Sequence, residues 1–267
     1  MFLIAGPCAI ESRDIVMHTA ETLKEVCSRL GITLYFKSSY DKANRTSMSS
    51  RGVGMEEGLK ILQEVKTTFE LPILTDVHES WHCAPVAEVA DVLQIPAFLS
   101  RQTDLLVAAA KTGRIVNVKK GQFMAPWDMR GAIAKIEDAQ PDELAEQSLY
   151  DPSKRIWLTE RGSSFGYGNI VVDMTSLVKM REYGYPVVFD ATHSVQQPSS
   201  QAGITGGNRE MVPHLIRAAV AVGIDGLFLE VHPQPENAIS DAANQVRLSD
   251  VEQLLKKMLE IDKLIHS

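Results

Sequence analysis

Four residues that lie far apart in the chain have side chains that can bind a metal ion, and each follows an apolar run typical of a β-strand. They are Cys8, His193, Glu230 and Asp241. A thiolate, an imidazole and two carboxylates form a mixed soft and hard ligand set, which suits a divalent transition ion such as Fe2+, Zn2+ or Mn2+ better than Mg2+ or Ca2+. If the strands are neighbours, the pattern predicts one metal site.

Taken singly, each of these residues has a simpler explanation. A lone cysteine near a strand end is usually a small buried hydrophobe, and an acidic residue there often caps the next helix. The metal prediction therefore depends on the combination. His78 and His232 also lie near strand ends and stay open as ligands, because alternation along a strand puts His232 on the same side as Glu230.

A second set of residues at the predicted strand ends is basic. It consists of Lys37, Lys42, Arg45, Arg101, Lys119, Lys120 and Arg161. In a chain with a formal net charge of -7, cations crowded on one face repel each other unless an anion binds between them. We therefore predict at least one phosphate site. Since adjacent strand residues point to opposite faces, only one of Lys119 and Lys120 can be a ligand, and the other is expected at the surface or an interface.

Two loops add to this picture. Residues 41–47 combine the guanidinium of Arg45 with amide and hydroxyl donors, a compact cradle for a phosphate or, alternatively, a polar turn. Residues 196–209 are rich in serine and glycine and follow a predicted strand, so they form either a lid or an ordinary loop.

The elements that must position these residues alternate along the chain. Continuous apolar runs typical of buried parallel strands occupy residues 2–5, 33–36, 73–77, 92–95, 115–118, 156–159, 187–190 and 227–231. Helical periodicity is clearest at 15–30, 54–69, 103–112, 172–183, 211–222 and 250–265. This alternation predicts a single α/β domain, residues 1–267, folded as a (β/α)8 TIM barrel, in which the last strand lies between the seventh and the first. The alternative is an open doubly wound sheet, which usually has a glycine-rich first turn where this chain has Gly6, Pro7 and Cys8.

Composition excludes several classes of protein. A chain of 267 residues with 45% hydrophobic content can bury a full core, and its negative charge disfavours nucleic acid and anionic membrane surfaces as partners. Three cysteines without CxxC spacing indicate a reducing compartment, so we expect a cytoplasmic protein. No apolar run approaches the length of a membrane span, and no signal peptide is expected.

Several long motifs, in order along the chain, resemble one family. They are IAGPCAIES (4–12), FKSSYDKANRTS (36–47), TDVHES (75–80), QIPAFLSRQTD (94–104), VNVKKGQF (116–123), LTERG (158–162) and DATHS (190–194). The sequence resembles the 3-deoxy-D-manno-octulosonate 8-phosphate synthase family over nearly its whole length. The resemblance implies a cytoplasmic homotetrameric transferase of lipopolysaccharide biosynthesis. Such an enzyme joins phosphoenolpyruvate, D-arabinose 5-phosphate and water in an aldol-type condensation.

The resemblance also implies roles for residues. Phosphoenolpyruvate would be held by Lys42, Lys119 and Arg161, with Lys37, Ser39 and Gln94 close by. The sugar phosphate would be bound by Asn44, Arg45 and Thr46, with Thr205 near a phosphate and Arg101 reaching across a subunit boundary. Lys42 would protonate the aldehyde oxygen, and Asp76, His78 and Asp241 are candidates for handling the protons of water. Cys8 and residues 240–245 resemble the metal-requiring branch of the family.

Two other functions stay open. The 3-deoxy-D-arabino-heptulosonate 7-phosphate synthases use erythrose 4-phosphate and share the Gly-Pro-Cys start, but usually have Lys-Pro-Arg-Thr-Ser where this chain has KANRTS at 42–47. A non-catalytic barrel would bind sugar phosphates and release no phosphate.

Overall fold

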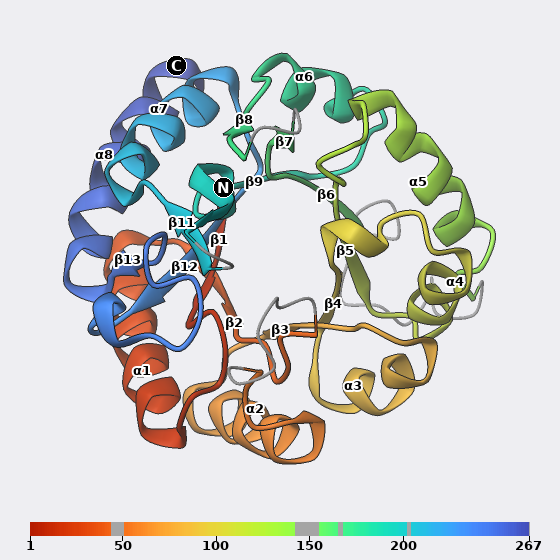
Figure 1. Ribbon diagram of the computed structural model, residues 1–267, viewed down its shortest axis with the longest axis horizontal. Coiled ribbons are helices and arrows are strands. Elements are labelled where there is room, and N and C mark those ends of the chain that lie inside the picture. Colours follow the sequence, from red (N-terminus) through yellow and green to blue (C-terminus); the bar gives the residue numbers. More distant parts are fainter. Residues whose placement is uncertain (44–50, 142–154, 165–167, 202–203, 267) are drawn as a thin grey trace.

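Eight parallel strands close into a barrel in the computed structural model, which describes residues 1–43, 51–141, 155–164, 168–201 and 204–266 (Figure 1). The strands are β1 (Phe2–Gly6), β2 (Thr33–Lys37), β3 (Ile73–Asp76), β4 (Val92–Ile95), β5 (Ile115–Lys119), β6 (Ile156–Glu160), β9 (Val187–Asp190) and β12 (Gly226–His232). Each pairs in parallel with the next, and pairing of β1 with β12 closes the ring. The predicted (β/α)8 barrel is confirmed.

Helices surround the barrel on its outer side (Figure 1). They are α1 (Arg13–Leu30), α2 (Met55–Phe69), α3 (Cys83–Val89), α4 (Thr103–Lys111), α5 (Met129–Glu137), α6 (Thr175–Arg181), α7 (Val212–Val222) and α8 (Val251–His266). Helix α1 begins after Ser12, whose hydroxyl oxygen accepts a hydrogen bond from the Ile15 amide, and ends at Gly31 with a left-handed φ of 68°. None of the helices in the described part of the chain is both long and apolar enough to cross a bilayer.

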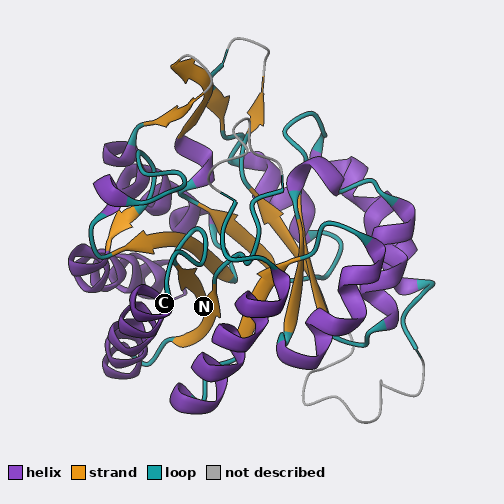
Figure 2. Cartoon of the chain, turned by 60° about the horizontal axis from the view of Figure 1, so that its bottom comes forward, coloured by secondary structure: helices purple, strands orange, loops and turns teal. Residues whose placement is uncertain are grey.

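Short antiparallel strands extend beyond one end of the barrel (Figure 2). Strands β10 (Gln196–Gln201) and β11 (Ile204–Gly207) pair as a hairpin directly after β9, and β7 (Ser163–Ser164) pairs with β8 (Ile170–Val171). A further short strand, β13 (Val246–Arg247), pairs with the end of β12. The predicted lid segment, residues 196–209, is thus built around a hairpin. Most of an acidic stretch at residues 137–151, whose composition is typical of an inserted loop or a short surface helix, lies outside the described residues.

The lower half of the barrel interior is apolar. Each strand contributes one buried side chain to a single cluster, which consists of Ile4, Tyr35, Leu74, Val92, Ile115, Trp157, Val188 and Phe228. Phe2 packs beneath this cluster, with its ring centroid 4.5 Å from that of Trp157. We call these eight residues the apolar layer, and they fill the barrel as a core.

The upper half is polar. Two residues further along each strand, on the same face because strand side chains alternate, lie the members of what we call the polar layer: Gly6, Lys37, Asp76, Gln94, Asn117, Thr159, Asp190 and Glu230. Two residues further still, β5 carries Lys119, and Arg161 follows β6. The chemistry therefore gathers at the carboxyl ends of the strands, where barrel enzymes have their active sites.

Gly6 is the one member of the polar layer without a side chain, and close packing requires this. A Cβ atom at Gly6 would lie 1.9 Å from the carbonyl oxygen of Lys37. Strands β2 and β12 flank β1, and across it Lys37 Nζ lies 3.0 Å from Glu230 Oε1. The glycine thus lets a buried ion pair form over β1.

Candidate active site

A cavity of about 290 Å³ opens at the carboxyl ends of the barrel strands. Most of the residues predicted to do chemistry line it: Lys37, Lys42, Asp76, His78, Gln94, Lys119, Arg161, His193, Glu230 and Asp241. These side chains come from all around the ring of strands. The fold therefore brings together groups that are up to two hundred positions apart in the sequence.

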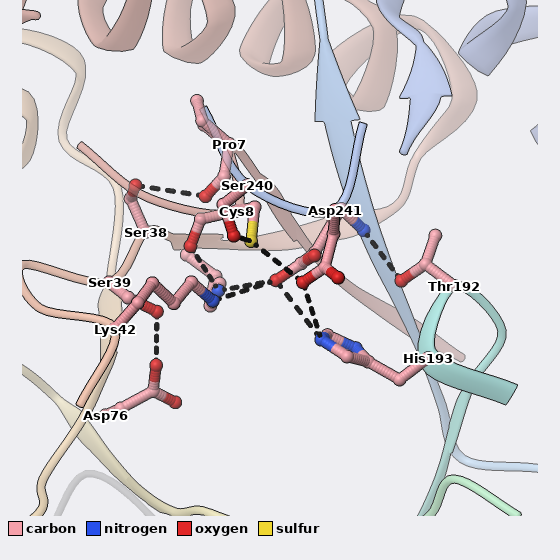
Figure 3. A network of polar contacts seen from close by, with 12 residues as sticks. Pro7, Cys8, Ser38, Ser39, Lys42, Asp76, Thr192, His193, Ser240 and Asp241 are labelled. Carbon is pink, nitrogen blue, oxygen red and sulfur yellow. Dashed lines mark hydrogen bonds and ion pairs between the residues drawn. The ribbon is translucent and has the colours of Figure 1, made fainter. Parts of the chain in front are cut away.

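The four predicted metal ligands converge at one side of this cavity, and Figure 3 shows Cys8, His193 and Asp241 facing one another. Ligand atoms of Cys8, Glu230 and Asp241 lie within 4.8 Å of one another, and all three residues are buried. His193 Nε2 lies 3.5 Å from Glu230 Oε1 and 3.9 Å from Asp241 Oδ2. Cys8 Sγ lies 3.3 Å from Asp241 Oδ2 and 2.9 Å from Ser240 Oγ.

These residues fit a divalent transition ion. Glu230 Oε2 is buried and has no hydrogen-bond partner among the residues that the structure describes, although a buried carboxylate oxygen normally has one. Burial, and then the charge of Glu230, raise the pKa of the Cys8 thiol far above its ordinary value. A cation at this point would supply the positive charge that a thiolate needs there.

Asp190 supports this group from below, and it was not among the predicted site residues. Its Oδ2 lies 2.8 Å from His193 Nδ1 and accepts a hydrogen bond from Lys119 Nζ at 2.7 Å. Burial acts to raise the pKa of Asp190, but His193 and Lys119 outweigh it and hold the pKa well below its usual range. A carboxylate at Nδ1 orients the ring so that Nε2 faces the other ligands, an arrangement common around metal-binding histidines.

The cations line the rest of the cavity. Lys119 Nζ lies 3.9 Å from the centroid of the Phe228 ring, and Arg161 Nη2 donates a 2.6 Å hydrogen bond to Gln196 Oε1. Arg161 Nη1 is buried and has no hydrogen-bond partner within the described part of the chain. Burial lowers the pKa of both Lys119 and Arg161, and Asp190 opposes this. A buried guanidinium with a spare donor is well suited to a phosphate or carboxylate oxygen.

Lys42 lines the cavity next to the cluster of possible metal ligands. Its Nζ is 3.4 Å from Glu230 Oε1. Burial acts to lower its pKa, but the acidic side chains around it, with Cys8 and Glu230 foremost, raise the pKa above its ordinary value. Lys42 is therefore a charged ammonium group at neutral pH.

The expectation that Lys120 lies at the surface or an interface is wrong. Its side chain is 1% exposed, and Nζ lies 3.5 Å from Glu160 Oε1 and donates to the carbonyl of Met124. The outward face of β5 is covered by neighbouring structure as well, so a lysine there is buried against a carboxylate. Lys119 alone of this pair lines the cavity, as alternation along the strand requires.

Asp76 accepts two hydrogen bonds inside the barrel. Gln94 Nε2 donates to its Oδ1 and Ser39 Oγ donates to its Oδ2. Burial acts to raise the pKa of Asp76, but Lys37 and Lys42 hold it well below its usual range. Asp76 is therefore an ionised carboxylate whose two oxygens are both engaged.

Other predicted residues lie elsewhere. Ser39 is buried beneath the cavity and does not line it, and Arg101 is exposed outside it, with its carbonyl bonded to Lys135. His232 Nε2 lies 3.6 Å from Glu11 Oε1, away from the cavity lining. Thr205 lies on β11, but its side chain is not described, and the predicted sugar-phosphate residues Asn44, Arg45 and Thr46 lie outside the described residues.

Gln196 is a second residue that sequence reasoning missed as part of the site. Its amide nitrogen donates a 3.0 Å hydrogen bond to Asp241 Oδ1, while its carbonyl oxygen accepts from Arg161. Gln196 therefore links the cationic half of the cavity to the cluster of possible metal ligands. The only signal in the sequence was its position at the start of the predicted lid.

A (β/α)8 barrel with a cation-lined cavity beside a cysteine, histidine and carboxylate cluster defines an enzyme that acts on small anions. The family described as DAHP synthetase I matches residues 1–267, and the chain belongs to this family.

Curated relatives are similar to the chain over nearly its full length. It is 53% identical over 264 residues to a protein of Fusobacterium nucleatum, covering 98% of this chain and 91% of the relative. It is 56% identical over 260 residues to one of a Cyanothece species (97% and 91%). It is also 56% identical over 264 residues to one of Agrobacterium fabrum (98% and 89%). All three relatives are named 2-dehydro-3-deoxyphosphooctonate aldolase.

Proposed function

We propose that the chain is a 3-deoxy-D-manno-octulosonate 8-phosphate synthase. It condenses phosphoenolpyruvate, D-arabinose 5-phosphate and water to the eight-carbon sugar phosphate and inorganic phosphate. The observation that carries this proposal is the identity of 53% and 56% to relatives whose name, 2-dehydro-3-deoxyphosphooctonate aldolase, denotes the same enzyme. The cation-lined cavity at the barrel mouth agrees with such substrates.

Phosphoenolpyruvate is held by Lys42, Lys119 and Arg161. These three side chains line one cavity, and Arg161 Nη1 has no hydrogen-bond partner there, so it offers a donor to the ligand. The phosphate of arabinose 5-phosphate is assigned to Asn44, Arg45 and Thr46, with contributions from Thr205 and from Arg101 of a neighbouring subunit. Binding both substrates by their charged ends places C3 of the enol beside the aldehyde carbon. The bimolecular reaction thereby becomes effectively intramolecular.

Lys42 acts as the general acid. As C3 attacks the aldehyde, negative charge develops on the aldehyde oxygen and positive character at C2 of the enol. A lysine that its surroundings keep protonated can transfer its proton to that oxygen, while Glu230, 3.4 Å away, holds the ammonium group in place. Water then adds at C2, and the tetrahedral intermediate loses phosphate.

His78 is the best placed of the three candidates to accept a proton from that water. Burial lowers its pKa, so its ring is neutral at pH 7, and its buried Nδ1 has no hydrogen-bond partner in the segments that the structure describes. Asp76, by contrast, is stabilised as a carboxylate and accepts hydrogen bonds on both oxygens. Asp241 faces Cys8 and Gln196.

Cys8, His193, Glu230 and Asp241 would hold the divalent ion, Fe2+, Zn2+ or Mn2+. When bound, such an ion acts as a Lewis acid that orients and polarises an oxygen of the substrate or of water. The remaining residues bind and orient the two anions, and they transfer the protons.

The protein works in the cytoplasm as a homotetramer. Self-association is supported by large aromatic side chains that the single chain leaves exposed, Phe98, Phe123 and Trp127, at 59%, 59% and 60% exposure. Exposed aromatic side chains of this size are typical of surfaces that contact another protein.

The substrate assignment is tested by measuring phosphate release with two aldoses. We expect rapid release from phosphoenolpyruvate with arabinose 5-phosphate and little with erythrose 4-phosphate. The reverse preference would assign the chain to the heptulosonate synthases. Binding of both ligands without phosphate release would mean a non-catalytic barrel.

The metal assignment is tested by Cys8→Ala. Protein purified without chelators is analysed for bound metal and for turnover. We expect the variant to lose both, whereas Cys27→Ala, which removes a buried thiol on α1 away from the cavity, keeps both. Full turnover of Cys8→Ala after chelation would contradict the metal role.

A further inference from the structure

A chain of hydrogen bonds runs through the polar layer along one wall of the barrel. Thr159 Oγ1 donates to Asn117 Oδ1 at 2.6 Å, and Asn117 Nδ2 donates to Gln94 Oε1 at 2.9 Å. Gln94 Nε2 then donates to Asp76 Oδ1. The four residues lie on four consecutive strands, β6, β5, β4 and β3, and none is more than 7% exposed.

Only one direction of donation along this series of hydrogen bonds satisfies all four side chains. An ionised carboxylate only accepts hydrogen bonds, so Gln94 must turn its amide nitrogen toward Asp76 and its carbonyl toward Asn117. Asn117 must then present its own nitrogen to Gln94, which leaves its carbonyl facing Thr159. The hydroxyl of Thr159 is therefore the donor that satisfies this buried carbonyl and completes the series of hydrogen bonds.

The two ends of this hydrogen-bonded series lie in different environments. Asp76 and Gln94 line the cavity, whereas Asn117 and Thr159 are not among the residues found to line it. The second N–H of Gln94 has no partner in the part of the chain that the structure describes, so it is available to a ligand. Two residues lower on the same strands, the apolar layer fills the same barrel with aliphatic and aromatic side chains and without a charged group. Since buried polar groups are costly, a polar chain in this place is better explained by the site than by stability.

We propose that Thr159 and Asn117 are positioning residues that hold the Gln94 amide with its free N–H directed at an oxygen of bound phosphoenolpyruvate. The identity of that ligand rests on the proposed function. Without the Thr159 hydroxyl, the buried Asn117 carbonyl loses its donor, and the Asn117 amide can turn and withdraw its N–H from Gln94. Gln94 then keeps its bond to Asp76 but loses the second contact that fixes the plane of its amide, so its free N–H is directed at the anion in only part of the molecules.

The test compares Thr159→Val, which keeps the shape of the side chain, with Thr159→Ser, which keeps the hydroxyl. The dissociation constant of phosphoenolpyruvate is measured by calorimetry without the aldose, and unfolding by urea is followed in parallel. We expect Thr159→Val to weaken binding at least fivefold and Thr159→Ser to stay within twofold of the wild type. Should the valine variant not fold, Asn117→Leu is measured in its place.

A second comparison separates positioning from a general loss of structure. Thr159→Val is also introduced into Gln94→Leu, where no amide remains to be oriented. There we expect it to have no further effect on binding, because the two changes act through one group. Unchanged binding by Thr159→Val, or an equal loss in both backgrounds, would overturn the proposal.

The substrate assignment can fail separately. A wild-type enzyme that prefers erythrose 4-phosphate still binds phosphoenolpyruvate, so the positioning result stands on its own. A wild-type protein that does not bind phosphoenolpyruvate contradicts both.

Discussion

The apolar layer and the polar layer of this barrel are built by the same eight strands, two residues apart. In the lower layer, eight side chains from Ile4 to Phe228 pack as a core. In the upper layer, the same strands carry buried charges, and these are paired, Lys37 with Glu230 and Lys119 with Asp190. The backbone geometry is the same in both, and only the side chains differ.

The comparison teaches how the barrel separates stability from chemistry. Apolar burial in the lower layer stabilises the fold, whereas buried ion pairs contribute little net stability because desolvation offsets their attraction. In the upper part, charge is nearly balanced. The cavity is lined by the cations Lys37, Lys42, Lys119 and Arg161 and by the carboxylates Asp76, Glu230 and Asp241, with Asp190 directly beneath. A divalent ion with a thiolate would add one positive charge, which favours anionic ligands.

Loss of Lys42 is expected to have the largest effect on function and little on folding. Lys42→Met removes both the proposed general acid and a contact to the anion, so we expect kcat/KM to fall about 10⁴-fold, at the upper end for a general acid. Glu230 keeps Lys37 as a partner, so the barrel should stay folded. Steady-state phosphate release and urea unfolding measure the two effects.

Lys60→Met is the matched control for this change. Lys60 is an exposed lysine on α2 that pairs with Glu56, so its loss should alter neither activity nor folding. Lys42→Met activity within tenfold of the wild type would remove Lys42 from the mechanism.

Truncation in the apolar layer is expected to have the opposite signature. Trp157 is 4% exposed, and its ring lies 4.9 Å from that of Tyr35. Trp157→Ala should lower the free energy of unfolding by about 3–5 kcal/mol, the usual cost of such a truncation. The kcat of the folded protein should change only a few-fold. Trp81→Ala, at a site that is 65% exposed, is the control for stability. A loss of kcat as large as that of Lys42→Met would show that the layers are not separable.

The barrel could be predicted because buried parallel strands are continuous apolar runs, and all eight were visible. Helices α3 and α5, with seven and nine residues, were not among those singled out, although α6 and α4 are equally short and were predicted. Strand order then followed from the barrel itself. The convergence of Cys8, His193, Glu230 and Asp241 could be predicted for the same reason, since Glu230 lies near the end of a strand and the other three follow one.

What the sequence could not predict depends on contacts between side chains. Lys120 was expected outside because alternation gives a direction and not the cover on that side. Asp190 and Gln196 act by touching other site residues at hydrogen-bond distance, and no spacing in the sequence reveals such contacts. The direction of the chain from Thr159 to Asp76 likewise becomes visible only when donor and acceptor atoms are known.

Phe228 lies where the two layers meet, so it gives the smallest but most discriminating effect. It belongs to the apolar layer, yet its ring centroid lies 3.9 Å from Lys119 Nζ and 5.6 Å from Lys37 Nζ. Phe228→Leu keeps an apolar side chain and removes the ring face that attracts these cations. We expect a loss of about 1 kcal/mol in stability and, from the lost cation–π contact, a weakening of phosphoenolpyruvate binding by roughly two- to fivefold.

Ile4→Val is the matched variant for this change. Ile4 belongs to the same layer, and its aliphatic side chain offers no ring face to Lys37 or Lys119. It should lose a similar amount of stability, about 0.5–1.5 kcal/mol, and leave binding unchanged. If Phe228→Leu behaves in the same way, the apolar layer ends below the site and only supports it. If binding falls for Phe228→Leu alone, the top of the apolar layer is also the floor of the anion site, and the two layers share one residue.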